Sequence, residues 1–181
     1  MVQRTQGWGG GAQWRQFTRA AIGGMAFTGN QGGVVTVNPG AGTFVPIGNG
    51  SPAHPLFALD PSVNFQIVLV PALSPNEAQF QKLRYVGAAR DLCVVLTCSL
   101  AFQDPALGAF GTAAKLTQNG VDIPNSEQEA QTGGLITSAD SLTVQGGAVM
   151  QPGDEFQILV ANITDGGNFV VSSCHLTAIG L

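Results

Sequence analysis

The stretch that decides the fold runs from Leu83 to Asp104 and reads LRYVGAARDLCVVLTCSLAFQD. A β-strand points alternate side chains to opposite faces, so residues at even positions share one face. In the second half of this stretch the even positions are strongly apolar: Leu92, Val94, Leu96, Cys98, Leu100 and Phe102. The odd positions are small and only weakly polar: Cys93, Val95, Thr97, Ser99 and Ala101. A strand of this composition is expected to be covered on both faces.

A hairpin is predicted directly downstream, where residues 115–123 read KLTQNGVDI. Asn119-Gly120 supplies two residues that tolerate positive φ, as a type I′ turn requires, between two segments of strand character. Further strands are expected over 63–69, 80–86, 142–144, 156–160 and 169–179. Turns are expected at 151–154 and 164–168, and no long segment has helical period. The pattern predicts an all-β sandwich or barrel.

The composition points to a surface that is covered by other chains. Hydrophobic residues make up 44% of the 181 residues and charged residues only 10%, against about 25% charged in an average soluble domain. We therefore expect much of the surface to be buried against another subunit. The three cysteines, Cys93, Cys98 and Cys174, follow no disulfide spacing and are expected to be free thiols.

Residues 1–58 are predicted to form an extended Gly/Pro-rich N-terminal arm, and residues 59–181 the globular domain. The arm has short apolar runs at 34–37 and 44–47, which predict one or two short strands. Its first 20 residues are basic, whereas the chain from Asp60 onward is acidic. Aromatic residues and arginines are typical interface anchors, which makes a set of residues in this segment candidate contacts with a partner. The set is Arg4, Trp8, Trp14, Arg15, Phe17 and Arg19. Folding of this segment back onto its own domain stays open as the alternative.

The ordered motifs of the body resemble the jelly roll of the tumour necrosis factor/complement C1q superfamily. They are similar above all to C1q-like trimeric domains of phage and virus head proteins. The resemblance is carried by residues 83–100, 116–126, 141–144 and 151–156, together with an apolar strand at the C-terminus. It implies a TNF/C1q-like jelly-roll β-sandwich that packs as a homotrimer around a threefold axis. Residues 1–58 have no counterpart in this resemblance.

No catalytic constellation can be assembled from the sequence, so an enzyme is not predicted. There is no phosphate-binding loop, no metalloprotease motif and no nucleophile elbow. Cys174 and His175 are adjacent, but on a strand they point to opposite faces, which argues against a catalytic pair. No cofactor is expected, and the histidines and cysteines show no zinc spacing. The loop at Asp165–Asn168 has calcium-ligand chemistry, although ordinary turn formation explains the same residues.

These observations favour a structural virion protein: a trimeric decoration (cement) protein on the capsid exterior, attached in part by its arm. The expected partners are the major capsid protein or neighbouring copies of the chain. A receptor-binding or adhesion module of a head fibre is the alternative, since fold does not settle function. A shell-forming single jelly-roll coat protein is a third interpretation, against which the sparse arginines count.

The location expected for the protein is the surface of the virion, after synthesis in the host cytoplasm. The sequence has no run of about 18 apolar residues and no signal-peptide core, so no membrane association is predicted. Three arginines in the arm are too few for a nucleic-acid-binding segment, so no nucleic acid is expected as a partner.

Overall fold

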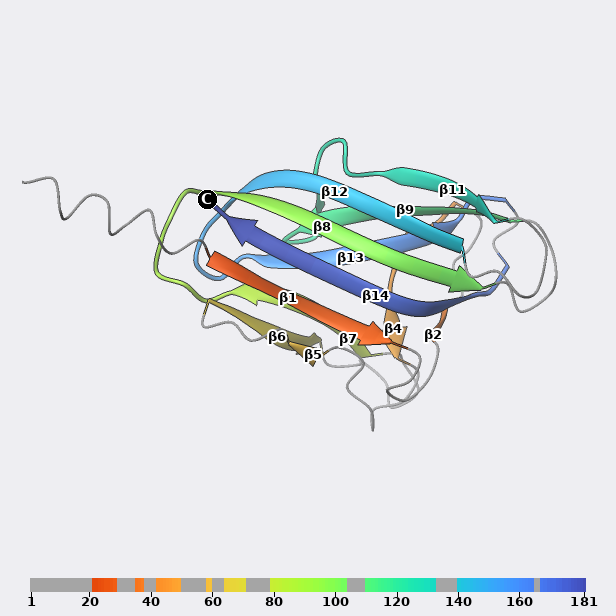
Figure 1. Cartoon of the computed structure of the whole chain (residues 1–181), viewed down its shortest axis with the longest axis horizontal. Helices are drawn as coiled ribbons and strands as arrows, with labels where there is room; N and C mark the ends of the chain where they lie inside the picture. Colours follow the sequence, from red (N-terminus) through yellow and green to blue (C-terminus); the bar gives the residue numbers. More distant parts are fainter. Residues whose placement is uncertain are drawn as a thin grey trace, which may run out of the picture.

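The computed structural model describes residues 21–28, 35–37, 42–49, 58–59, 64–70, 79–103, 110–132, 140–164 and 167–181. Within these ranges every regular element is a β-strand, and the strands form two sheets stacked face to face (Figure 1). All the pairings between them are antiparallel. The all-β prediction is confirmed.

The first sheet, called sheet A below, has six strands. Its order is β12 (Asp140–Met150), β8 (Leu92–Gln103), β14 (Phe169–Gly180), β1 (Ala21–Thr28) and β5 (Ala58–Leu59), with β2 (Val35–Val37) also paired to β14.

The second sheet, sheet B, has eight strands. Its main order is β10 (Val121–Asp122), β9 (Phe110–Gln118), β13 (Glu155–Asn162), β7 (Gln79–Tyr85) and β4 (Gly48–Asn49). The remaining strands extend it: β11 (Gln128–Thr132) pairs with β9, β3 (Val45–Pro46) with β13, and β6 (Phe65–Val70) with β7.

The strand pairing shows a jelly roll. The chain is wrapped as nested pairs: β1 pairs with β14, β7 with β13, β8 with β12, and β9 with β11. With β6 set aside, which pairs with β7, the first long strand thus pairs with the last, the next with the one before last, and so on inward. Of these pairs, two lie in sheet A and two in sheet B, so the paired chain crosses repeatedly between the layers, as a jelly roll requires. The predicted jelly-roll β-sandwich is confirmed.

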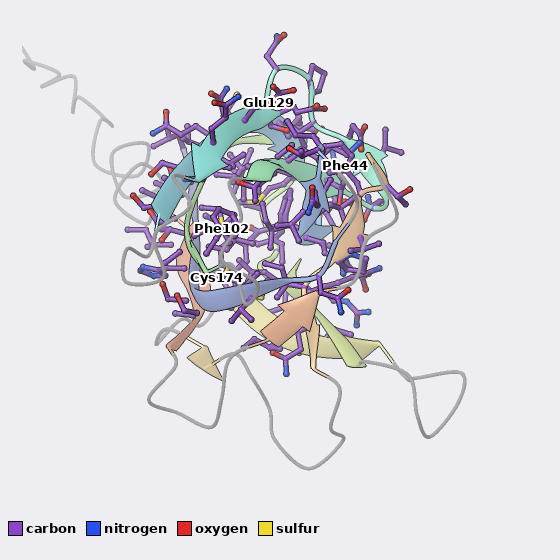
Figure 2. The ribbon with its side chains drawn as sticks, turned by 90° about the vertical axis from the view of Figure 1, so that its right-hand side faces the viewer. Phe44, Phe102, Glu129 and Cys174 are labelled. Carbon is purple, nitrogen blue, oxygen red and sulfur yellow. The ribbon has the colours of Figure 1, made fainter. Side chains whose placement is uncertain are left out.

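The core lies between the sheets, and β8 supplies a continuous part of it. Val94, Leu96, Cys98, Leu100 and Phe102 are all buried, as the alternation predicted. Seen end-on, Phe102 lies in the interior between the layers, whereas Glu129 lies on the outside (Figure 2). The odd residues of β8 from Cys93 to Ala101 face outward and are exposed or half-buried, so no second layer covers them within the described part of the single chain.

The turns predicted at Asn119-Gly120 and at 151–154 both form, whereas the turn predicted at 164–168 lies partly outside the described residues. Asn119 and Gly120 have φ of 54° and 81°, which places a two-residue turn of type I′ character between β9 and β10. In the turn before β13, Gly153 has φ of 97° and the carboxylate of Asp154 accepts a hydrogen bond of 2.7 Å from the backbone N–H of Gln151. Asp154 also accepts from the side chains of Gln118 and Asn119, at 2.6 and 2.7 Å. Through these hydrogen bonds Asp154 joins the Asn119-Gly120 turn to the turn before β13.

The described residues before residue 58, which are 21–28, 35–37 and 42–49, differ from the prediction of an arm outside the domain. β1 pairs with β14 along its whole length, from Ala21↔Gly180 to Thr28↔Ser173, and Met25 is buried in the core. β2 and β3 match the short strands that were expected, and they too pair with the body. The glycines of β1 obscure its strand character in the sequence. Gly23 is needed because a Cβ there would come within 2.4 Å of the Phe65 ring.

Replacing Leu96 with alanine should lower the free energy of unfolding by about 2–5 kcal/mol, because a fully buried Leu leaves a cavity when truncated. Chemical denaturation measures this value. Gln66→Ala on the exposed side of β6 is the control and should change the free energy by less than about 0.5 kcal/mol. A Leu96→Ala cost below about 1 kcal/mol would contradict the inward register of β8.

Candidate functional site

The outer face of sheet A is the surface that stands out in this protein. Its residues come from alternate positions of four neighbouring strands, and the strand register aligns them in rows. One row runs from Gly147 on β12 through Val95 on β8 and Ile179 on β14 to Ile22 on β1. The next rows along the strands carry Thr, Ser and Gln side chains, with His175 on β14. In the described strands the face is therefore a regular array of apolar, hydroxyl and amide side chains together with one histidine.

One end of this face is apolar. Five large hydrophobic side chains are exposed there, and we call them the apolar end: Ile22 (54% exposed), Val95 (46%), Val149 (53%), Ile179 (37%) and Leu181 (72%). Leu181 is held beside β8 by a 2.8 Å hydrogen bond from its backbone N–H to the carbonyl of Cys93. The C-terminus and the start of β1 lie together at this end of the sandwich (Figure 1). Contiguous apolar surface of this kind marks an interaction site.

Charge is divided unequally between the two sheets. The described strands of sheet A contain a single Asp, Glu, Lys or Arg residue, which is Asp140, the first residue of β12. The strands of sheet B carry Lys82, Arg84, Lys115, Asp122, Glu129 and Glu155. Depletion of charge is what distinguishes the buried centre of a protein interface from ordinary surface. Sheet A has the character of an interface, and sheet B that of a solvated face.

Five of these six charged side chains of sheet B form ion pairs with one another: Lys82, Arg84, Lys115, Asp122 and Glu155. The Glu155 carboxylate accepts hydrogen bonds from Lys82 Nζ at 2.9 Å and from Arg84 Nε at 3.0 Å, and Arg84 Nη2 also contacts it. Bonding from Arg84, and next from Lys82, lowers the pKa of Glu155. Lys115 Nζ lies 2.6 Å from Asp122 and 4.1 Å from the centre of the Phe44 ring.

The structure separates the three cysteines as the strand alternation predicted. Cys93 is exposed on the outer face of sheet A, whereas Cys98 and Cys174 are buried. His175, the neighbour of Cys174, lies on the exposed face, so the two side chains of the adjacent pair diverge. Burial, followed by the hydrogen bond with Cys98, raises the pKa of Cys174. The contact between Cys98 and Cys174 could not be found in the sequence, because it depends on the register of β8 against β14.

The candidate contacts of the arm cannot be placed on this surface. Arg4, Trp8, Trp14, Arg15, Phe17 and Arg19 all lie outside the described residues. Asp165, of the candidate calcium loop, lies outside them as well. Among the residues that are described, no group of three or more His, Cys, Asp or Glu side chains is arranged to hold a metal ion. The same residues contain no helix of the length and hydropathy needed to span a bilayer.

The lowered pKa of Glu155 predicts a pH-dependent contribution to stability. A carboxyl whose pKa is lower in the folded chain stabilises it above the ordinary pKa of about 4.3, and this contribution is lost as the pH falls through the lowered value. The free energy of unfolding should therefore be higher for the wild type than for Glu155→Gln at pH 7, and the difference should shrink below about pH 4. Chemical denaturation across that range measures it. The loss of stability caused by Glu155→Gln should be smaller in an Arg84→Met background than in a Lys82→Met background, because the bond from Arg84 is the larger cause of the lowered pKa. A loss of stability that does not vary with pH would contradict a lowered pKa for Glu155.

The solved structures that are similar to this chain have low sequence identity to it. No protein-family model matches the chain, and no curated protein matches it. Among solved structures, Eiger TNF from S. frugiperda is 14% identical, with a TM-score of 0.46 over 90% of this chain and 94% of that chain. Murine APRIL, in a crystal structure at pH 5.0, is 8% identical, with a TM-score of 0.44 over 90% of this chain and 100% of that chain. Because these scores are low, the jelly-roll assignment rests on the strand pairing described above.

Proposed function

We propose that this chain is a structural, self-assembling protein that forms a homotrimer through the outer face of sheet A, and that the trimer decorates the exterior of a virus capsid. In this proposal the chain carries no enzymatic activity and works by binding. The observation that supports it most is the scarcity of charge in the described strands of sheet A, where Asp140 is the single Asp, Glu, Lys or Arg residue, combined with the exposed apolar end.

A second copy of the chain is the occupant that best fits this face. The rows of Ser, Thr and Gln side chains offer hydrogen-bonding groups without charges, so burying them involves no desolvation of ions. The apolar end supplies the hydrophobic centre of the contact. An interface of standard size buries about 1,600 Å², and a face built from four long strands has the extent for it.

A threefold ring fits this face better than a twofold contact between two copies of it. In a twofold contact, sheet A of one copy would have to fit against sheet A of the other. In a threefold ring, sheet A of each copy contacts a different surface of the next copy, so its rows of uncharged side chains need not fit against identical rows. Sheet B, with its internally paired charges, would then face outward in every copy. The sequence resemblance to trimeric C1q-like head proteins favours the same arrangement.

The attachment to a capsid is assigned to the first 20 residues. They join the body at Ala21, where β1 begins beside the C-terminus. This segment combines the arginines and large aromatic residues that anchor protein interfaces, and its positive charge complements an acidic partner surface. The major capsid protein or a neighbouring trimer is the proposed partner.

Val95→Arg tests the association surface. Val95 lies in the row at the centre of the apolar end, and an arginine there brings an uncompensated charge into the contact. Size-exclusion chromatography with light scattering should give three chains for the wild type and a single chain for the variant at micromolar concentration. Gln66→Arg, which adds the same charge to the exposed side of sheet B, should leave the trimer intact.

Two outcomes of that measurement would refute parts of the proposal separately. A wild-type protein of one chain at micromolar concentration would exclude the trimer. If the assembly formed by Val95→Arg has the same number of chains as the wild type, the contact between copies does not involve the outer face of sheet A around Val95.

Deletion of residues 1–20 tests the role of the arm. The cut leaves β1 complete, so the truncated chain should fold and form a trimer of normal stability. In co-sedimentation with particles that lack the protein, the truncated trimer should stay in the supernatant while the full chain pellets. Equal pelleting of both would assign the attachment to the body. A truncated chain that does not fold would show that residues 1–20 belong to the domain itself.

A further inference from the structure

Two thiols meet in the core of the sandwich, away from the association surface. Cys98 on β8 and Cys174 on β14 are 0% and 1% exposed, and their Sγ atoms lie 3.6 Å apart. Figure 2 shows Cys174 within the interior, between the two layers. The two residues are separated by 76 positions in the sequence, so the contact joins distant parts of the chain.

The strand register brings these thiols together. Cys98 is directly opposite Leu176, and Cys174 is directly opposite Leu100, so the cysteines occupy diagonal positions on the inner face of the same strand pair. The register of β14 against β8 shifts between Val171 and Ser173, immediately before Cys174. Such a bulge increases the local twist of the strands, and stronger twist brings one diagonal pair on a face closer together. The side chains that surround the pair in the core are apolar.

The folded core protects the pair from reagents. The thiolate is the form that attacks a disulfide, and burial raises the pKa of Cys174, so the folded chain disfavours that form. A glutathione molecule also has no access to atoms that are this completely buried. Cys93, in contrast, is exposed and open to the same reagents.

We propose that Cys98 and Cys174 are a cross-linking site whose state is decided while the chain folds. When folding takes place in the presence of a small disulfide oxidant, such as glutathione disulfide, the two cysteines join in a disulfide. When folding takes place in a reducing medium, they stay as two thiols for as long as the chain remains folded.

The chemistry is a balanced thiol–disulfide exchange. In the unfolded chain, one cysteine thiolate attacks glutathione disulfide, which breaks the S–S bond of the reagent, forms a mixed disulfide and releases one glutathione thiolate. As β8 and β14 pair, the second cysteine thiolate attacks the protein sulfur of the mixed disulfide and releases the second glutathione thiolate. Each released thiolate takes up one of the two protons that the cysteines lost. The protein loses two electrons and glutathione disulfide gains them.

The cross-link requires the two thiols to approach each other. The sulfurs must close from 3.6 Å to the bond length of about 2.0 Å, which requires rotation of the side chains and movement of the backbone that carries them. The product would tie β8 to its neighbour β14, the last strand of the chain. Because such a bond restricts the unfolded chain, the cross-linked protein should unfold at higher denaturant concentration than the reduced protein.

Refolding of a Cys93→Ser variant of the full chain tests the proposal, since it removes the exposed thiol. The variant is unfolded with denaturant and reductant, then refolded either in a glutathione buffer rich in the disulfide or in reductant. A third sample, already folded and reduced, is incubated in the same oxidising buffer for the same time. Alkylation and mass spectrometry count the free thiols, and peptide mapping without reduction identifies the linked residues.

The chain refolded under oxidising conditions should lose both thiols, contain a Cys98–Cys174 linked peptide and keep the circular dichroism of the native protein. The folded, reduced sample should retain both thiols. In a Cys93→Ser/Cys98→Ala control, Cys174 should end as a free thiol or a glutathione adduct, with no linked peptide. Two free thiols, glutathione adducts alone, or a linked but non-native chain after oxidative refolding of Cys93→Ser would overturn the cross-link. Equally fast oxidation of the folded sample would overturn the protection by the core.

Discussion

The structure depends on the position of β14 between β8 and β1. The last strand bonds to β8 on one side over most of its length and to β1 on the other side from Ala21↔Gly180 to Thr28↔Ser173. This double pairing joins the first and last strands that the structure describes and fixes the centre of sheet A. It also decides which side chains point inward, because a shift of one residue would exchange the buried and exposed faces. Leu176 and Ala178 are buried for this reason, while Ile179 is exposed.

The close packing of the layers restricts residue size at several positions. A Cβ on Gly180 would come within 2.4 Å of the Met150 side chain, and a Cβ on Gly23 would overlap the Phe65 ring. Phe65 in turn packs on Tyr85, with ring centres 5.3 Å apart. Gly23 therefore leaves room for an aromatic side chain of the facing sheet, and Gly180 leaves room for Met150 of its own sheet. The weak strand preference of glycine is offset at these positions by the packing that it permits.

The contrast between the sheets links the fold to the proposed assembly. In sheet B each described ion pair is formed between neighbouring strands, as between Glu155 on β13 and Arg84 on β7, so these charges have partners within the chain. The described strands of sheet A contain a single Asp, Glu, Lys or Arg residue, Asp140, and their outward rows combine apolar and hydroxyl side chains. A protein made to remain a monomer would gain solubility from charges on such a face. Their absence is consistent with a face that is covered in the working assembly.

The local features could be predicted from the amino-acid sequence: the alternation of β8, the Asn119-Gly120 turn, the turn before β13 and the all-β class. Each of these depends on residues within one strand or one turn, where the period of two and the φ preferences act directly. The tertiary structure alone decided that β1 belongs to sheet A, that Val95, Ile179 and Ile22 form one row, and that Cys98 meets Cys174. These relations arise from the register between strands that are far apart in the chain. Register follows from packing across the whole sandwich, and no local pattern encodes it.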